Sequence, residues 1–382
     1  MDFNLSQEQQ MLQDTAARLV RDQYTFEARQ AHAATPLGYS RGFWAQLGEL
    51  GLTAVPFDES VGGMGGSSVD LMPIMTELGR GLCLEPYLHS VVFAGGLLAQ
   101  LGTAQQQARW LGPVASAEAQ LAVAFEEPNS HYCLNQVETR AEAVPEGYRL
   151  NGRKGAVIAG HSADAILVSA RTQGEAGDEA GISLFVLAPD TPGVRRRGYP
   201  TVDGPRACEL FLDGAVVPAD AMLGEVGQAF DALRYQQGRA IAAQCAEALG
   251  SMQAACALTL DYLKTRKQFG VPIGKFQVLQ HRMVDMHTEL QQATSMAILA
   301  ACVADEPDSL ERSRTLATAK FICSRAGRFI AEQAIQSHGG IGMTWEYVLA
   351  HHAKRLVMLS HQFGDDDHHL KAYAAMMDMA VA

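Results

Sequence analysis

The sequence contains few cysteines for its length, and none stands in a spacing that suggests a metal site or a disulfide framework. They are odd in number, scattered and never in a C-x-x-C arrangement. Structural zinc sites and small disulfide-rich folds both need closely spaced cysteines. We therefore expect reduced thiols in a cytoplasmic protein. The seven are Cys83, Cys133, Cys208, Cys245, Cys256, Cys302 and Cys323.

Positive charge is also scarce. The chain has 30 Lys and Arg against 42 Asp and Glu, a formal net charge of −12. Because binding to phosphates needs a basic surface, we expect no nucleic-acid partner. A hydrophobic content of 48% with 19% charged residues is typical of a globular protein and excludes wholesale disorder. At 382 residues the chain exceeds one ordinary core, which favours two or three domains.

Segments that would enter or cross a membrane are missing. The first residues have neither a basic stretch nor an apolar one, so no secretory signal is expected. Residues 240–260 carry a single charge, Glu247, but alanine dominates there and Gln244, Ser251 and Gln253 interrupt the apolar pattern. This composition favours a buried helix of a soluble protein over a membrane span.

A standard dinucleotide-binding fingerprint is absent as well. Gly339, Gly340 and Gly342 follow an expected helix instead of a strand, which excludes a Rossmann motif on context. A helix C-cap and turn would explain one of these glycines but explains three poorly. Backbone that several glycines leave open can approach a pyrophosphate closely, and Gln336 could donate to its oxygens.

What the sequence does contain is a change from helical to strand patterns and back, without an internal repeat. Residues 1–117 have helical spacing and begin with a capping box at Ser6 to Gln9. Residues 118–226 hold short apolar runs between turn residues, which predicts an antiparallel β-sandwich or barrel. Residues 227–382 predict an antiparallel four-helix bundle, so the fold class is α+β in three domains. The four expected helices are 229–266, 277–303, 309–339 and 347–382.

Several segments, together with this domain order, carry a family resemblance. Arg266-Lys267-Gln268-Phe269-Gly270 would alone be an inter-helix turn with basic residues that the helix dipole favours. Together with Gln336-Ser337-His338-Gly339-Gly340 and the hairpin Asn151-Gly152-Arg153-Lys154, it resembles the acyl-CoA dehydrogenase family over essentially the whole chain. Within that family, the ending at residues 363–370 is most similar to the small subunit of pimeloyl-CoA dehydrogenase.

The resemblance implies FAD as the cofactor and a site built across a dimer interface. The backbone of residues 156–159 would run along the flavin ring, and Gln277 would lie near the adenosine of the neighbouring subunit's FAD. The residues expected to contact that same FAD are Arg266, Phe269, Gln336, Gly339 and Gly340.

The catalytic base is missing from both positions at which the family usually carries it. Where a Tyr-Glu-Gly-Thr segment is common, this chain has Phe363-Gly364-Asp365, and Ala240 occupies the second position. Glu247 is our candidate, because it is a lone carboxylate among small residues and burial would make it a better base. The alternative is a structural glutamate paired with an Arg or Lys across a helix interface. The aspartates at 365–367 are fallback candidates.

The flavin-facing segments depart from the family pattern. The usual Thr-Glu-Pro and Gly-Ser-Asp segments are replaced by residues 125–132, where only Glu127-Pro128 survive and Tyr132 stands near a family serine. The common Trp-x-Thr is Ala156-Val157-Ile158. The tail, with His361, His368, His369 and the aspartates, invites a metal site, but neighbouring residues at a helix start point apart, so no metal is expected.

The leading hypothesis is a cytoplasmic, FAD-dependent acyl-CoA dehydrogenase that converts an acyl-CoA to the trans-2-enoyl-CoA. The resemblance implies an electron-transfer flavoprotein as electron acceptor and a homodimer, homotetramer or heterotetramer with a related subunit. One alternative is a non-catalytic subunit that completes a partner's FAD site in an α2β2 enzyme. Another is a flavin monooxygenase on the same fold.

Overall fold

The computed structural model describes residues 5–379 and divides the chain into two compact units. Unit 1 comprises Met1–Gln30, Ser68–Cys83 and Ile241–Ala382, and unit 2 comprises Ala31–Ser67 and Leu84–Ala240. Each unit therefore joins segments that are far apart in the sequence. The three-domain boundaries expected from the sequence remain a prediction, and the secretory-signal expectation concerns, in part, residues outside the described range.

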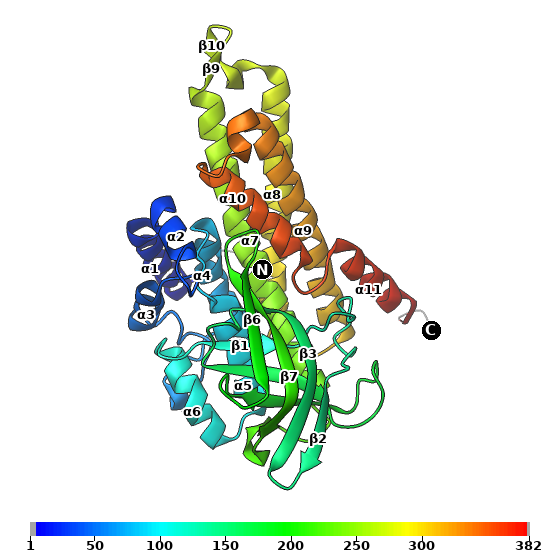
Figure 1. The fold of residues 1–382 in the computed structure, drawn as a ribbon. Coiled ribbons are helices and arrows are strands. Elements are labelled where there is room, and N and C mark those ends of the chain that lie inside the picture. Colours follow the sequence, from blue (N-terminus) through cyan, green and yellow to red (C-terminus); the bar gives the residue numbers. More distant parts are fainter. Residues whose placement is uncertain (1–4, 380–382) are drawn as a thin grey trace. The chain divides into compact units, whose positions relative to one another are not determined.

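Unit 2 is built around one eight-stranded sheet (Figure 1). Strands β6, β7, β3, β2, β4, β5 and β8 follow one another across it, and β1 pairs with β4. The strands are β1 (Leu121–Ala124), β2 (Arg140–Val144), β3 (Gly147–Ile158), β4 (Ala165–Arg171), β5 (Ile182–Leu187), β6 (Val194–Pro200), β7 (Arg206–Val217) and β8 (Met222–Leu223).

The sheet is mostly antiparallel, as expected, but two of its pairings are parallel. β1 pairs with β4 from Leu121 opposite Ala165 to Ala124 opposite Val168, and β2 meets β4 at Arg140. Both β1 and β4 are buried along their whole length, and continuous apolar runs suit strands covered on both faces. Alternation alone did not reveal this direction, because a fully apolar strand carries no information on its partner.

Short helices complete unit 2, and those before β1 lie within the segment 1–117 that the sequence predicts to be helical. Leu88–Ala94 forms a buried π-helical turn that contacts β1 and leads directly into α5. Thr103 and Gln106 make a full capping box at the start of α6. The elements of this unit are α3 (Arg41–Glu49), α5 (Gly95–Leu101) and α6 (Ala104–Ala115).

Unit 1 is helical, with α8, α9, α10 and α11 packed together and α1 packed on α4 (Figure 1). The capping box at Ser6 is confirmed, because its hydroxyl accepts from the backbone of Gln9 while the Gln9 amide returns to Ser6. The helices are α1 (Gln7–Gln23), α4 (Ser68–Arg80), α8 (Gln277–Val303), α9 (Leu310–His338), α10 (Val348–His361) and α11 (Asp366–Met379). The short α2 (Phe26–Ala33) and the long α7 (Phe230–Thr265) have residues in both units.

The apolar stretch at 240–260 lies inside α7. Its alanines are buried, among them Ala240, Ala246 and Ala255. Within residues 5–379, no helix is both long and apolar enough to cross a membrane.

The expectation of one helix from residue 347 to the end is wrong. The chain forms α10 and α11 instead, separated by a turn at Gln362 to Asp365. Phe363 and Gly364 have positive φ angles of 58° and 100°, which no α-helix tolerates. His369 Nε2 lies 2.9 Å from the carbonyl oxygen of Phe363 and holds the turn from the next helix. Contact with a residue of α11 is a tertiary effect that helical periodicity does not report.

Candidate functional site

One end of the helical unit presents the first group of expected cofactor residues. Arg266 follows α7, and the short strands β9 (Lys267–Gln268) and β10 (Val271–Pro272) form a hairpin beyond it. Phe269 lies at the tip of this hairpin with a φ of 53° and is 89% exposed. Gln277 opens α8 and is also exposed. A phenyl ring held in solvent by a strained turn points to a surface that another molecule covers.

The second group, Gln336, Gly339 and Gly340, lies at the end of α9. Gln336 is exposed, and Gly339 ends the helix with a φ of 66°. A methyl group added to either glycine would meet no atom within 4 Å, so this backbone is open to solvent. A helix C-cap needs one glycine, and the open backbone at Gly339 and Gly340 leaves room for a ligand.

A stacked pair of rings brings these two groups together. Tyr262, one turn before Arg266, stacks on His338 with ring centroids 4.4 Å apart. His338 directly precedes Gly339, and its Nε2 lies 3.3 Å from the hydroxyl of Tyr347. Burial lowers the pKa of His338 below its ordinary value. The six expected cofactor residues therefore occupy one end of unit 1.

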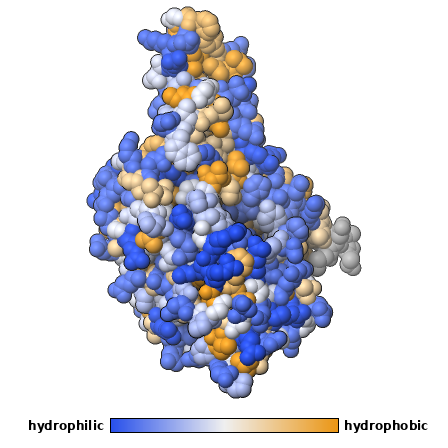
Figure 2. Space-filling model, viewed as in Figure 1, coloured by the Kyte–Doolittle hydropathy of each residue, from blue (hydrophilic) through white to orange (hydrophobic). Residues whose placement is uncertain are grey.

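This end fits a phosphate-bearing cofactor. No hydrogen bond links the side chains of Arg266, Gln277 and Gln336 to other residues in the range 5–379, so their donors remain for a ligand. Arg guanidinium groups suit bidentate contact with phosphate. Figure 2 shows apolar surface gathering at the end of the helical unit where Figure 1 places β9 and β10. Exposed Phe276 and Val278 belong to this region.

Glu247, the candidate base, lies inside unit 1 and is ion-paired. Arg355 on α10 donates from Nε at 2.7 Å and from Nη2 at 2.6 Å, both to Oε1. Glu247 and Arg355 are both buried, at 7% and 9% exposure. This ion pair agrees with the alternative of a structural glutamate paired with an Arg across a helix interface. The catalytic role of Glu247 remains a prediction. No residue in the described range 5–379 donates a hydrogen bond to the second oxygen, Oε2.

Close helix packing fixes the position of Glu247. A methyl group on Gly79 would lie 2.0 Å from the Glu247 carbonyl oxygen, and one on Gly250 would lie 1.8 Å from the Thr76 carbonyl. Only glycine permits α4 and α7 to approach so closely. One turn after Glu247, Ser251 Oγ lies 2.9 Å from Nδ1 of His352.

His351 and His352, which are adjacent on α10, are both buried. They are 1% and 2% exposed. Burial lowers the pKa of His352 to about 3, so it stays neutral at ordinary pH. His351 lies 3.3 Å from an Arg29 nitrogen through Nδ1 and 2.9 Å from the Trp345 carbonyl oxygen through Nε2. Both histidines serve as polar contacts between helices, since the partners come from other parts of the sequence.

In unit 2, the retained Glu127 has a structural explanation. Its Oε1 accepts from Lys154 Nζ at 2.6 Å, and the lysine is fully buried. Lys154 also donates to Ser169 Oγ, and Glu127 accepts from the backbone of Glu138 and Thr139. Burial lowers the pKa of Lys154 to about 8. The ion pair ties β3 to the segment after β1, a role that sequence spacing did not reveal.

The residues beside this ion pair depart from ordinary backbone geometry. His131 and Tyr132 have φ angles of 45° and 70°, and Ala156 has a φ of 49°. Glu126 replaces the usual threonine, and burial raises the pKa of its carboxyl to about 7. A glutamate side chain is larger than the threonine of the family pattern, and Tyr132 stands near the position of a family serine. That this segment contacts a flavin, as the resemblance implies, remains a prediction.

The acidic tail forms capping and ion-pair contacts. Asp365 Oδ1 accepts from the backbone of His368 at 2.8 Å, and Asp366 pairs with Arg328. No group of three or more potential metal ligands comes together among residues 5–379. The absence of a metal stays an expectation, and Asp365 remains a fallback base.

Comparison with known proteins identifies the family. Family models of the acyl-CoA dehydrogenase N-terminal, middle and C-terminal domains match residues 6–118, 122–215 and 234–377. The chain belongs to the acyl-CoA dehydrogenase family, whose members are oxidoreductases with FAD as cofactor. The α+β fold expected from the sequence is thereby confirmed.

Individual relatives agree with this assignment. Probable acyl-CoA dehydrogenase YngJ of Bacillus subtilis (strain 168) is 30% identical over 91% of this chain and 92% of that protein. Butyryl-CoA dehydrogenase from Megasphaera elsdenii is 27% identical, with a TM-score of 0.90 over 99% of this chain and 100% of its own. A chain of the ChsE4–ChsE5 complex from Mycobacterium tuberculosis is 26% identical, with a TM-score of 0.88 over 99% of each chain. The narrower pimeloyl-CoA dehydrogenase type stays a prediction.

Proposed function

We propose that the protein catalyses α,β-dehydrogenation of an acyl-CoA thioester to the trans-2-enoyl-CoA. The observation that carries the proposal is the exposed end of unit 1, where Arg266, Gln336 and two open glycines fit the diphosphate of FAD. FAD, when bound, accepts the hydride from the β-carbon of the substrate. An electron-transfer flavoprotein as acceptor, and a cytoplasmic location, belong to the same proposal.

Glu247 is the proposed base for the α-proton. Its Oε1 is held by both nitrogens of Arg355, while Oε2 keeps a lone pair for an incoming proton. The close approach of Gly79 fixes the helix that carries it, so the carboxylate has little freedom to turn. A positioned general base contributes about 10²- to 10⁴-fold to the rate.

The test is Glu247→Gln, measured in the assembly that turns over octanoyl-CoA, pimeloyl-CoA or a steroid-side-chain CoA. We expect kcat to fall by about 10²- to 10⁴-fold with flavin retained, because glutamine cannot accept the proton. Glu77→Gln is the matched control, since Glu77 is equally buried and pairs with Arg80 at 2.9 Å. If Glu247 is only structural, Glu247→Gln will lower the melting temperature and leave kcat at the value of the control.

A second candidate function is favoured by unit 2. The chain would complete the FAD site of a related subunit while its own flavin-facing segment, with Glu126, Tyr132 and Ala156, no longer supports a flavin. The similar chain in the ChsE4–ChsE5 complex belongs to an assembly of two different subunits. Flavin retention, and not turnover, separates the two candidates, because only a self-sufficient enzyme would hold flavin without a partner.

A further inference from the structure

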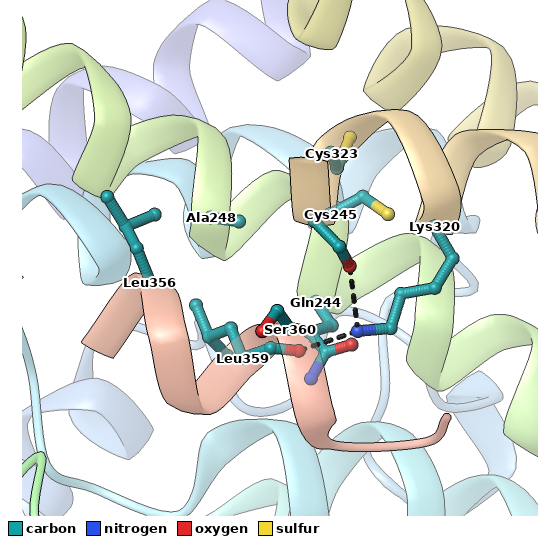
Figure 3. Close-up of a pocket in the computed structure, with 9 residues that line it drawn as sticks. Gln244, Cys245, Ala248, Lys320, Cys323, Leu356, Leu359 and Ser360 are labelled. Atoms are coloured by element: carbon teal, nitrogen blue, oxygen red, sulfur yellow. Dashed lines mark hydrogen bonds between the residues drawn. The ribbon is translucent and has the colours of Figure 1, made fainter. Parts of the chain in front are cut away.

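A small cavity inside unit 1 contains reactive groups that neither candidate function uses. It has a volume of about 10 Å³, roughly the space that one buried water needs. Figure 3 shows Lys320 reaching from α9 into the centre of this pocket, with Gln244 and Cys245 on α7 beside it. The lining residues are Gln244, Cys245, Ala248, Lys320, Cys323, Ser324, Leu356, Leu359 and Ser360.

Two polar groups in the cavity have hydrogen-bonding capacity that residues 5–379 leave unused. Lys320 Nζ donates to the Leu359 carbonyl oxygen at 2.6 Å and to Ser324 Oγ at 3.3 Å, which uses two of its three donors. The buried Oε1 of Gln244 accepts no hydrogen bond from residues 5–379. A donor and an acceptor that face the same water-sized space define a site for a small, polar, oxygen-containing molecule.

Two thiols adjoin this site. Cys245 and Cys323 are 1% and 3% exposed, and both line the cavity. The hydrogen bond from Cys323, with the nearby Lys320 charge, holds the pKa of Cys245 below its ordinary value. The pKa of Cys323 is raised. One sulfur is thus prepared as a nucleophile and the other lies in contact to attack it afterwards.

The other buried cysteines have no such surroundings. Burial raises the pKa of Cys208 to about 11 and that of Cys256 to about 12. Neither lines the Lys320 cavity. They provide internal controls, because they share the burial of Cys245 but lack its thiol partner and its lysine.

We propose that Cys245 and Cys323 form a dithiol site that hydrogen peroxide oxidises to a disulfide between α7 and α9. The Cys245 thiolate attacks one peroxide oxygen, forming an S–O bond as the O–O bond breaks, and the departing hydroxide takes a proton from Lys320 to become water. The Cys323 sulfur then attacks the sulfenic sulfur, and the hydroxide that leaves takes the Cys323 thiol proton to become a second water. Two thiols and one peroxide thus give one disulfide and two waters, with Lys320 recovering the proton first released by Cys245.

The size of the cavity sets the selectivity. Hydrogen peroxide has one oxygen more than the water that the cavity accommodates, and Lys320 and Gln244 can hydrogen-bond to its oxygens. Aromatic disulfide reagents are too large to enter. Bulky oxidants should therefore modify the exposed Cys133 and leave Cys245 intact in the folded chain.

The experiment treats the folded, reduced, full-length protein with hydrogen peroxide and maps its peptides after denaturing alkylation. We expect one cross-linked peptide pair containing Cys245 and Cys323. In Cys323→Ser, dimedone added together with the denaturant should trap a sulfenic acid at Cys245, whereas Cys245→Ser should leave Cys323 unmodified. An aromatic disulfide reagent serves as the size control. Melting temperatures establish that both serine variants are folded.

Two results would overturn the proposal. One is Cys245 remaining reduced at peroxide concentrations that oxidise Cys133. The other is Cys208 or Cys256 reacting as fast as Cys245. That result would mean that transient opening of the folded chain, and not the Lys320 cavity, controls the reactivity of the buried cysteines. Both results are independent of turnover, so the fate of the dehydrogenase proposal does not affect them.

Discussion

The exposed end of unit 1 keeps the residues of the family pattern, whereas residues 125–132 of unit 2 depart from it. Arg266, Phe269 and Gln336 are present and solvent-exposed, and no side-chain hydrogen bond joins Arg266 or Gln336 to another residue in the described chain. In unit 2, Glu127 is retained but Glu126 and Tyr132 replace residues of the family pattern. The resemblance implies that the first group serves the FAD of a neighbouring subunit. The residues expected to contact a neighbouring subunit's FAD are therefore kept, whereas those expected beside the chain's own flavin are changed.

Within unit 2 the difference is finer still. Glu127 and Lys154 form a buried ion pair between β3 and the segment after β1, so removing one partner should destabilise the fold whether or not flavin binds. Glu126 and Ala156 have no such structural commitment. A chain that lost a ligand but kept its fold would retain Glu127 and Lys154 and change Glu126 and Ala156, which is the pattern seen here.

The largest effect is expected from Lys154→Met, which tests the structural role of the ion pair between Glu127 and Lys154. Removing one partner of a buried ion pair leaves the Glu127 carboxylate uncompensated and costs about 3–5 kcal/mol of unfolding free energy. Urea unfolding measures the loss. The double variant with Glu127→Gln should recover part of the stability, because no buried charge remains. A single variant as stable as the wild type would contradict the assigned role.

Glu126→Gln should give the next largest effect, and only at high pH. Burial raises the pKa of Glu126 from 4.5 to about 7, so between these values the folded chain retains a proton that the unfolded chain has lost. Stability therefore falls as pH rises through this window, and by pH 8 the carboxyl costs at most about 3 kcal/mol. The variant should match the wild type near pH 4 and exceed it at pH 8 in urea unfolding.

Exposed Glu142 supplies the control for this prediction, as Glu142→Gln should leave the pH dependence unchanged. Equal stability of Glu126→Gln and wild type at pH 8 would show that the Glu126 carboxyl is solvated. Burial of the Glu126 carboxyl would then no longer distinguish this segment from one that binds a flavin.

Arg266→Ala should have a smaller but functionally decisive effect. A charge-assisted hydrogen bond to phosphate is worth about 1.5–3 kcal/mol, so FAD affinity should fall roughly 10- to 100-fold. FAD fluorescence on dilution measures release from the chain alone and from its assembly with a related subunit. Lys267→Ala, at the adjacent exposed position, is the control. Flavin that stays bound in Arg266→Ala would contradict the prediction, because Arg266 would then not be needed to hold the cofactor.

Much of the fold was predictable because its signals are local. The capping box at Ser6 and the apolar run of β4 depend on residues that are neighbours in the sequence. The break between α10 and α11 was missed, since the contact from His369 to the Phe363 carbonyl competes with helical periodicity. The parallel pairing of β1 with β4 was missed for a similar reason, because strand direction is a property of the partner.

The site divides in the same way. Arg266, Gln336 and the glycines could be named from the sequence because the motif of each segment is contiguous. The partner of Glu247 could not be named, because Arg355 lies 108 residues away and nothing in either helix marks the pair. The burial of His351 and His352 was likewise hidden, since polar residues on a helix are exposed unless other helices supply partners.

The sequence by itself determined the family, the order of helices and strands, and the segments with which this chain can meet a cofactor. Those properties follow from local propensity, hydrophobic periodicity and contiguous motifs. Only the tertiary structure decided which charges are buried and paired, as with Glu127 and Lys154, and which reactive groups share a cavity, as with Cys245 and Lys320. Long-range packing makes those choices, because desolvation and hydrogen bonding act between side chains that the chain brings together only when it folds.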